Sequence, residues 1–343
     1  MMDALILIKI IIILIIFAIT LFIAMYSTYA ERKIAAVMQD RLGPNRAGPW
    51  GILQPLADGG KMFFKEDFIP ALANKKLFII APGIAMFTAL MTSAIIPWGG
   101  TVTMFGYTFD LQVADVDIGI LYILGVVSMG VYGIMIGGWA SNNKYSLFGA
   151  VRSSSQMISY ELAMGLAILA VVMTSGSLSL KDIVESQDGG KWNVFYQPLA
   201  FLIFIVCAFA ECNRAPFDLA ECESELIGGY HTEYGSMKLG FFLFAEYINM
   251  FISSAVISTL FFGGYNFPFM HELGLSTTAL SLIGTAVFFA KIFFFIFFFM
   301  WVRWTLPRFR YDQLMHLGWK TLIPLAVLNL MLTGGFLLIK DLF

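Results

Sequence analysis

The chain contains 343 residues, of which 59% are hydrophobic and only 13% are charged, and its formal net charge is -2. Soluble domains carry about 25% charged residues, so this composition argues against a water-soluble protein. The small net charge hides an uneven distribution of Lys and Arg and gives no indication of nucleic-acid binding. We therefore expect an all-α membrane protein with one integral membrane domain over residues 1–343.

A helix needs about 20 apolar residues to cross a bilayer core about 30 Å thick, and it must pair its own backbone polar groups there. The first apolar run of the chain has no basic segment before it and exceeds the length of a signal-peptide core, which indicates a retained span. Eight segments in all meet the requirement, at approximately 5–29, 77–97, 118–140, 155–174, 194–210, 239–262, 278–301 and 322–339. The sequence thus predicts a bundle of eight transmembrane helices.

The connections between these spans differ strongly in their basic residues. Of the 21 Lys and Arg residues, 16 lie in alternate connections that share one side, four lie toward the other side, and Lys291 lies inside the seventh span. By the positive-inside rule the basic side is cytoplasmic, or matrix-facing in a mitochondrion. Because the number of spans is even, both termini are then expected on the opposite, periplasmic side.

The first long loop contains an amphipathic pattern at approximately residues 55–68. Asp58, Lys61 and Lys65 fall on one helical face, and Leu56 with two phenylalanines is available to the other face. This pattern favours a helix that lies in the membrane interface. A solvated loop that contains aromatic residues by chance is the alternative.

Besides Lys9 near the start of the first span, three charged residues lie inside predicted spans, where a charge needs a partner, a water-filled cavity or a function. Glu246 shares a helical stripe with Asn249 and Ser253, which predicts that this stripe faces the interior of the bundle. Glu161 is either a functional carboxylate or an interfacial acid that reaches water. Lys291 lies among phenylalanines and requires a carboxylate or another polar partner from a different helix.

The segment from Glu211 to Glu225 is rich in acids, and Phe217 and other apolar residues interleave them. Its only certain counter-charge is Arg214, so its carboxylates would titrate as a coupled set and take up or release protons when a nearby charge changes. A fully solvated acidic loop is the alternative. The acids of the segment are Glu211, Asp218, Glu221, Glu223 and Glu225.

No pattern for a cofactor or metal is visible in the sequence. The three cysteines do not have the spacing of a zinc, redox or iron-sulfur site, and no nucleotide-binding loop, dinucleotide fingerprint, haem-attachment motif or nucleophile triad is present. We therefore expect no cofactor or metal bound by this chain alone, and partners that supply electrons. A stand-alone secondary transporter that uses Glu161, Glu246 and Lys291 as an ion path is a different class of interpretation.

Several specific strings resemble one family, the membrane-embedded H subunits of proton-translocating NADH-quinone oxidoreductase, or respiratory complex I. The resemblance covers essentially the whole chain. The strings are Ala30-Glu-Arg-Lys33, Gln39-Asp-Arg-Leu-Gly-Pro-Asn-Arg46, Leu53-Gln-Pro-Leu-Ala-Asp58, Ala210-Glu-Cys-Asn-Arg-Ala-Pro-Phe-Asp218, Glu221 through Tyr230, and Arg303-Trp-Thr-Leu-Pro-Arg-Phe-Arg-Tyr-Asp-Gln-Leu314.

This resemblance implies a component of a translocase that encloses much of a quinone tunnel where the peripheral arm meets the membrane arm. Quinone would be the substrate, and the flavin and iron-sulfur clusters would belong to partner subunits. The partners would be the quinone-site and terminal iron-sulfur subunits of the peripheral arm and small membrane subunits of the pumping arm. A bacterial inner membrane is expected, with the mitochondrial inner membrane and a ferredoxin- or hydrogenase-linked complex as alternatives.

The resemblance also assigns roles to residues at matching positions. The residues that would line or flank the quinone tunnel are Glu31, Arg32, Asp58, Lys61 and Phe217. The residues that would couple quinone chemistry to proton movement are Glu161, Glu211, Arg214, Asp218, Glu221, Glu223, Glu225, Glu246 and Arg303.

Overall fold

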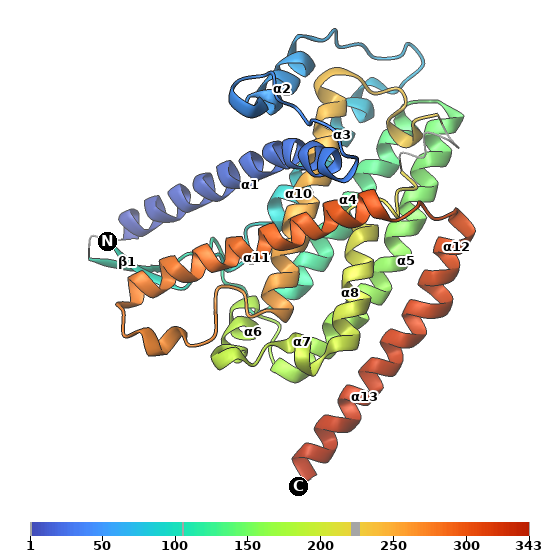
Figure 1. The fold of residues 1–343 in the computed structure, drawn as a ribbon. Coiled ribbons are helices and arrows are strands. Elements are labelled where there is room, and N and C mark those ends of the chain that lie inside the picture. Colours follow the sequence, from blue (N-terminus) through green and yellow to red (C-terminus); the bar gives the residue numbers. More distant parts are fainter. Residues whose placement is uncertain (1, 105, 221–226, 343) are drawn as a thin grey trace.

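The computed structural model describes residues 2–104, 106–220 and 227–342 and is almost entirely helical (Figure 1). Glu221, Glu223 and Glu225, to which the family resemblance assigned coupling roles, lie outside the described residues. The long helices are α1 (Met2–Met38), α3 (Lys75–Thr92), α4 (Gly119–Ala140), α5 (Lys144–Ser175), α10 (Ser236–Phe261), α11 (Thr277–Thr305) and α13 (Ile323–Leu342).

Shorter elements connect these helices. The short helices are α2 (Gln54–Phe64), α6 (Leu180–Ser186), α7 (Asn193–Tyr196), α8 (Pro198–Glu211) and α12 (Tyr311–His316). Single helical turns are η1 (Pro49–Gly51), η2 (Asp188–Gly190), η3 (Gly229–His231), η4 (Met270–Leu273) and η5 (Leu317–Leu322), the last being π-helical and continuous with α12 and α13. The helix α2 covers most of the amphipathic segment that the sequence predicts at 55–68. Its residues Phe63 and Phe64 are exposed.

Within the described residues, seven helices are long and apolar enough to span a membrane, or eight if one bent pair counts as a span. The bent pair corresponds to the span expected at 194–210, where residues 188–196 meet α8 at 74°. The break follows from Pro198, which has no backbone N–H and starts a helix well but does not continue one. Gln197 at the break donates to Thr333 of α13 at 3.0 Å, so the polar break is paired inside the bundle.

Two further features differ from the sequence prediction. The helix α5 begins at Lys144 rather than near residue 155, because the Asn143 side chain accepts a hydrogen bond from the Tyr145 amide at 2.9 Å and caps its first turn. A two-stranded antiparallel hairpin, β1 (Thr101–Met104) with β2 (Tyr107–Asp110), follows α3. The hydropathy criterion for spans does not detect strands of four residues.

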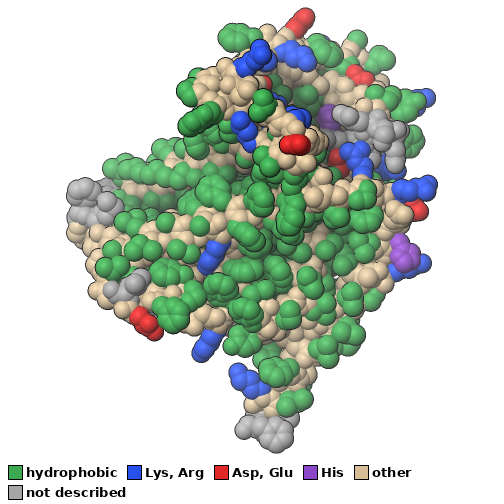
Figure 2. All heavy atoms as spheres, in the orientation of Figure 1, with side chains coloured by type: hydrophobic (Ala, Val, Ile, Leu, Met, Phe, Trp, Pro, Cys, Tyr) green, Lys and Arg blue, Asp and Glu red, His purple; other side chains and the backbone are tan. Residues whose placement is uncertain are grey.

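The helix α10 is the centre of the bundle, since 67% of its most apolar window is buried. The helices α3, α11, α1 and α8 pack against it, α4 packs on α3, and α5 packs on α8. In Figure 1, α1 and α11 run side by side at a steep inclination to α10, and α13 diverges toward the C-terminus. Glycine permits the closest contact between α3 and α4, because a Cβ at Gly133 would lie 2.9 Å from the Ala85 amide nitrogen. Hydrophobic side chains cover most of the visible surface (Figure 2).

Candidate functional site

A cavity with a volume of about 360 Å³ lies between α1, α2, α10 and the last turn of α11. We call it the charged cavity, because ionisable side chains from every one of these elements and from the loop after α8 line it. Its polar lining residues include Glu31, Arg32, Asp58, Arg214, Glu246, Tyr247 and Arg303. One wall is apolar and contains Met25, Leu243 and Phe244. The cavity thus offers polar groups and hydrocarbon to a single ligand.

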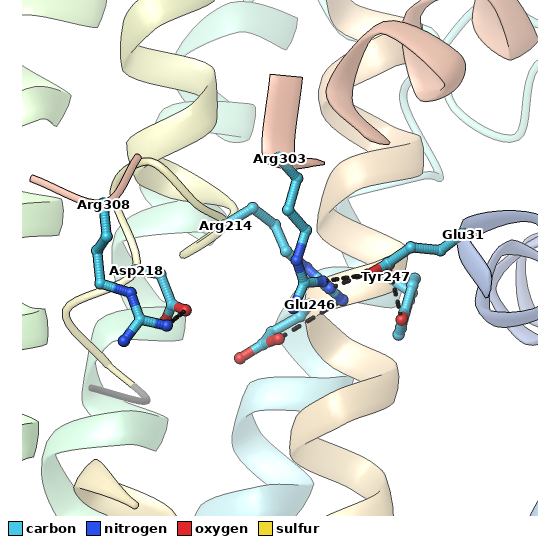
Figure 3. Close-up of polar contacts among 7 residues, drawn as sticks. All are labelled: Glu31, Arg214, Asp218, Glu246, Tyr247, Arg303 and Arg308. Carbon is cyan, nitrogen blue, oxygen red and sulfur yellow. Dashed lines mark hydrogen bonds and ion pairs between the residues drawn. The ribbon is translucent and has the colours of Figure 1, made fainter. Parts of the chain in front are cut away.

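Glu31 is the centre of the polar network in this cavity (Figure 3). Its carboxylate forms ion pairs with Arg214 at 3.3 Å and with Arg303 at 2.6 Å. It also accepts a hydrogen bond from the Tyr247 hydroxyl at 2.9 Å. Three segments that are far apart in the sequence therefore meet at one buried carboxylate, which is only 6% exposed.

Arg214 joins Glu31 to Glu246. Its guanidinium lies 3.6 Å from the Glu246 carboxylate and stacks on the Tyr247 ring at 4.0 Å from the ring centre. Burial by itself lowers the pKa of a guanidinium, but the adjacent Tyr247 hydroxyl and the carboxylates of Glu31 and Glu246 outweigh burial and raise the pKa of Arg214 above its usual value. Arg214 therefore remains a cation while its carboxylate neighbours are ionised.

Arg32 and Asp58 form an ion pair at 2.6 Å that links α1 to α2 at the more exposed side of the charged cavity. Gln54 donates to the other oxygen of Asp58 at 2.9 Å. Lys61 is exposed on α2 and is not part of the lining. Phe217 is buried against Tyr160 and Phe309 rather than in the cavity wall.

A second, smaller cavity lies deeper in the bundle and shares Glu246 with the charged cavity. Glu211 from the end of α8 also lines it, together with Asn249 and Ser253. The prediction that Glu246, Asn249 and Ser253 face the bundle interior is therefore confirmed. Its volume of about 40 Å³ has room for two or three water molecules. We call it the inner cavity.

Glu161 lies on the far side of Glu211, close enough for the two carboxylate charges to interact. It is half-buried and accepts a hydrogen bond from the Ser128 hydroxyl of α4. It also lines an open groove between α5 and the start of α13. Four carboxylates thus follow one another from the charged cavity to this groove, in the order Glu31, Glu246, Glu211 and Glu161.

The described part of the acid-rich segment is buried, which excludes a fully solvated loop for residues 212–220. Asp218 is 3% exposed and pairs with Arg308 at 2.7 Å, apart from the Glu31 network (Figure 3). Gln156 of α5 donates to the Phe217 carbonyl at 2.7 Å and holds the segment against the bundle. Among the described residues, no group of His, Cys, Asp or Glu side chains is arranged to hold a metal ion.

Lys291 has the polar partners that the sequence required, but they are backbone carbonyls rather than a carboxylate. Its ammonium donates to the carbonyls of Phe262, Gly264 and Asn266 at 2.7, 2.8 and 2.8 Å. It also lies over the Trp192 ring at 5.4 Å from the ring centre. Lys291 therefore caps the chain where α10 ends, at the end of the bundle opposite the charged cavity.

Sequence reasoning missed Tyr247 and Arg308. Tyr247 directly follows Glu246. A polar aromatic residue next to a carboxylate inside a span is a pattern that could have indicated Tyr247 as a site residue. Arg308 was interpreted only as one of several basic residues that determine topology, although it lies in one of the specific strings. No short-range pattern indicates which arginine meets which carboxylate, because the partners are 90 or more residues apart.

Comparison with known proteins identifies the family. A profile described as NADH dehydrogenase matches residues 10–334. H subunit 1 of the NADH-quinone oxidoreductase of Cytophaga hutchinsonii is 65% identical over 96% of this chain and 97% of that protein. The corresponding H subunits of Flavobacterium johnsoniae and Leptospira biflexa are 63% and 55% identical over 99% and 87% of this chain, and over 98% and 86% of their own lengths. Because the similarity extends along almost the whole chain, the chain belongs to the family of H subunits, the multi-pass membrane components of the proton-translocating NADH-quinone oxidoreductase of bacteria.

Proposed function

We propose that the charged cavity forms part of the path by which quinone moves between the bilayer and partner subunits that reduce it. The observation that carries this proposal is the lining itself, which joins an apolar wall to buried charged groups. A quinone has the same two-part chemistry, a hydrocarbon tail and a polar head. The Nε of Arg214 is buried and makes no hydrogen bond within the part of the chain that the structure describes, so a polar atom of a ligand or a water molecule would complete the site.

We also propose that the carboxylates from Glu31 to Glu161 respond to the charge that quinone reduction creates. Two carboxylates, Glu31 and Glu246, face two guanidiniums, Arg214 and Arg303, in the charged cavity. An added negative charge beside this balanced set favours proton uptake by a carboxylate. Glu246 borders both cavities, and water in the inner cavity would connect it to Glu211. Asp218 and the undescribed acids Glu221, Glu223 and Glu225 would extend this coupled set.

In this proposal the basic loops face the cytoplasm and both termini face the periplasm of a bacterial inner membrane. Electrons come from flavin and iron-sulfur clusters in partner subunits, and this chain holds none of them. The exposed phenylalanines of α2 support an interfacial position for that helix beside the tunnel. The groove beside Glu161 faces outward from the bundle, which suits contact with a membrane subunit of the pumping arm.

Narrowing the charged cavity tests the tunnel. In Thr28→Trp the indole would enter the cavity from α1, whereas Val37→Trp changes an 81% exposed position on the same helix. We expect Thr28→Trp to lower NADH oxidation by a long-tailed quinone and to leave oxidation by ferricyanide unchanged. Val37→Trp should keep both activities. Normal quinone reduction by Thr28→Trp would contradict the tunnel.

Glu211→Gln tests the carboxylate series separately, since Glu211 lines the inner cavity and not the charged cavity. We expect quinone-linked NADH oxidation to fall and ferricyanide-linked oxidation to persist, because the electron path in the partner subunits is intact. Equal loss of both activities would contradict a specific role in coupling.

A further inference from the structure

A third cavity lies between the N-terminal halves of α1 and α11, and neither the quinone path nor the carboxylate series uses it. Its volume is about 160 Å³, and its walls include Ile12 and Ile16 of α1, Phe289 of α11 and Trp98 from the segment before the hairpin. We call it the apolar cavity. Trp98 is 5% exposed and stacks on Phe289 at 5.7 Å between ring centres, which fixes one wall.

The exposed lining is almost entirely apolar and offers no free hydrogen-bond donor to a ligand. Thr20 and Thr285 are the hydroxyl residues of the wall, and each donates to its own helix, at 2.8 Å to the Ile16 carbonyl and at 2.9 Å to the Ser281 carbonyl. The Trp98 indole N–H donates to the Ser93 carbonyl at 3.2 Å. A cavity of this kind excludes water and ions and accepts hydrocarbon.

The ammonium group of Lys9 lies at the rim of this cavity. Lys9 precedes Ile12 and Ile16 by three and seven residues, so it lies on the same face of α1 one turn nearer the N-terminus. Its ammonium donates to the carbonyls of Gln112 and Val113 at 2.7 and 3.2 Å, and these residues directly follow Leu111 of the cavity wall. An ammonium has three N–H donors, so two bonds to the loop leave one for an anion.

The charge of Lys9 favours an anionic ligand at this rim. Lys9 is the only Lys or Arg in the first 30 residues, and it lies four residues inside the first predicted span, from which a lysine side chain can reach the membrane interface. Asp110, on the hairpin strand that leads to Gln112, is paired with Lys181 at 2.8 Å, so its charge is compensated.

We propose that the apolar cavity and Lys9 form a binding site for a phospholipid with an anionic headgroup. One acyl chain occupies the cavity between α1 and α11, and the phosphate accepts a hydrogen bond from Lys9. Such a lipid fills the gap between α1, which carries Glu31, and α11, which carries Arg303. The site takes hydrocarbon and phosphate together, which distinguishes it from the charged cavity.

The test uses the intact complex in lipid nanodiscs with a photoactivatable diazirine in the acyl chain of phosphatidylglycerol or phosphatidylcholine. Crosslinks to α1 and α11 are mapped by peptide mass spectrometry. We expect phosphatidylglycerol to label residues 12–20 about fivefold more than phosphatidylcholine, the factor for about 1 kcal/mol from one basic residue. Lys9→Gln should reduce phosphatidylglycerol labelling to the phosphatidylcholine level, and Lys9→Arg should preserve it.

Filling the cavity provides a second test. Ile16→Trp should abolish labelling of this segment, while Leu14→Trp, at a 63% exposed position on the same helix, should leave it unchanged. The proposal would be overturned if both lipids labelled the segment equally, or if Ile16→Trp were labelled as strongly as Leu14→Trp. Either result would mean that the probe labels α1 only from the bulk bilayer. Displacement of the phosphatidylglycerol probe by a long-tailed quinone would also overturn the proposal, because the cavity would then hold a quinone tail.

Discussion

Replacing Lys291 with methionine should loosen the chain reversal after α10 without affecting the charged cavity. The substitution removes the donor to three carbonyls, those of Phe262, Gly264 and Asn266. A buried carbonyl without a donor costs about 1–3 kcal/mol, which sets an upper limit of ~9 kcal/mol for three. Methionine also removes the desolvation cost of the buried ammonium, several kcal/mol, so we expect a net loss of about 2–4 kcal/mol.

Hydrogen exchange of the intact complex measures this loss locally. The amides of Gly264 and Asn266 donate to carbonyls at 2.8 Å in this turn and should be protected in the wild type. A loss of about 2–4 kcal/mol corresponds to exchange about 30- to 700-fold faster in Lys291→Met. Peptides around Glu246 should keep their protection, and Phe294→Met, at a 62% exposed position of α11, should behave as wild type. Unchanged protection of the turn combined with lost proton translocation would refute a capping role and favour a charge-transfer role for Lys291.

Three other predictions follow from named contacts. Gly133→Ala should cost about 1–3 kcal/mol through overpacking and lower the yield of assembled complex on native gels, whereas Gly125→Ala, with open space at its Cβ, should not. Arg214→Met should prevent assembly, because removing one partner of a buried ion pair costs about 3–5 kcal/mol, while Arg214→Lys should assemble but reduce quinone slowly. The hydrogen bond to Asp110 raises the pKa of Lys181 above its usual 10.5, so this pair stabilises the contact between the hairpin and α6 below pH 10.5, and the stabilisation is lost as pH rises through the higher folded-state value. Proteolysis of the hairpin in the wild type should therefore increase as the pH rises through the folded-state pKa of Lys181. Lys181→Met should lack this increase.

Local patterns were sufficient for most of the helical fold. Long apolar runs must become helices in a membrane, and the spacing of Glu246, Asn249 and Ser253 indicated an inward-facing stripe. The isolated charge of Lys291 required a polar partner, which the structure contains. These inferences depend on one helix at a time and on the cost of burying charge.

Contacts between distant segments could not be predicted in the same way. Glu31 and Arg214 are 183 residues apart, and they meet because α10 packs against both α1, which carries Glu31, and α8, which precedes Arg214. Pro198 is a local signal for the break at Gln197, but no local pattern reveals that Asn329 and Thr333 of α13 pair with the Gln197 side chain. The type of partner for Lys291 was also open, because the carbonyls it caps belong to a turn whose position follows from the tertiary fold.

Glu246 is the residue most important to the proposed coupling of quinone reduction to proton movement, because its carboxylate borders both the charged cavity and the inner cavity. The most direct measurement is proton translocation per NADH oxidised by purified complex in liposomes, compared between wild type and Glu246→Gln. We expect Glu246→Gln to oxidise NADH with ferricyanide at the wild-type rate but to reduce quinone slowly and to translocate fewer protons. Wild-type quinone reduction and wild-type proton translocation in Glu246→Gln would contradict the proposed coupling.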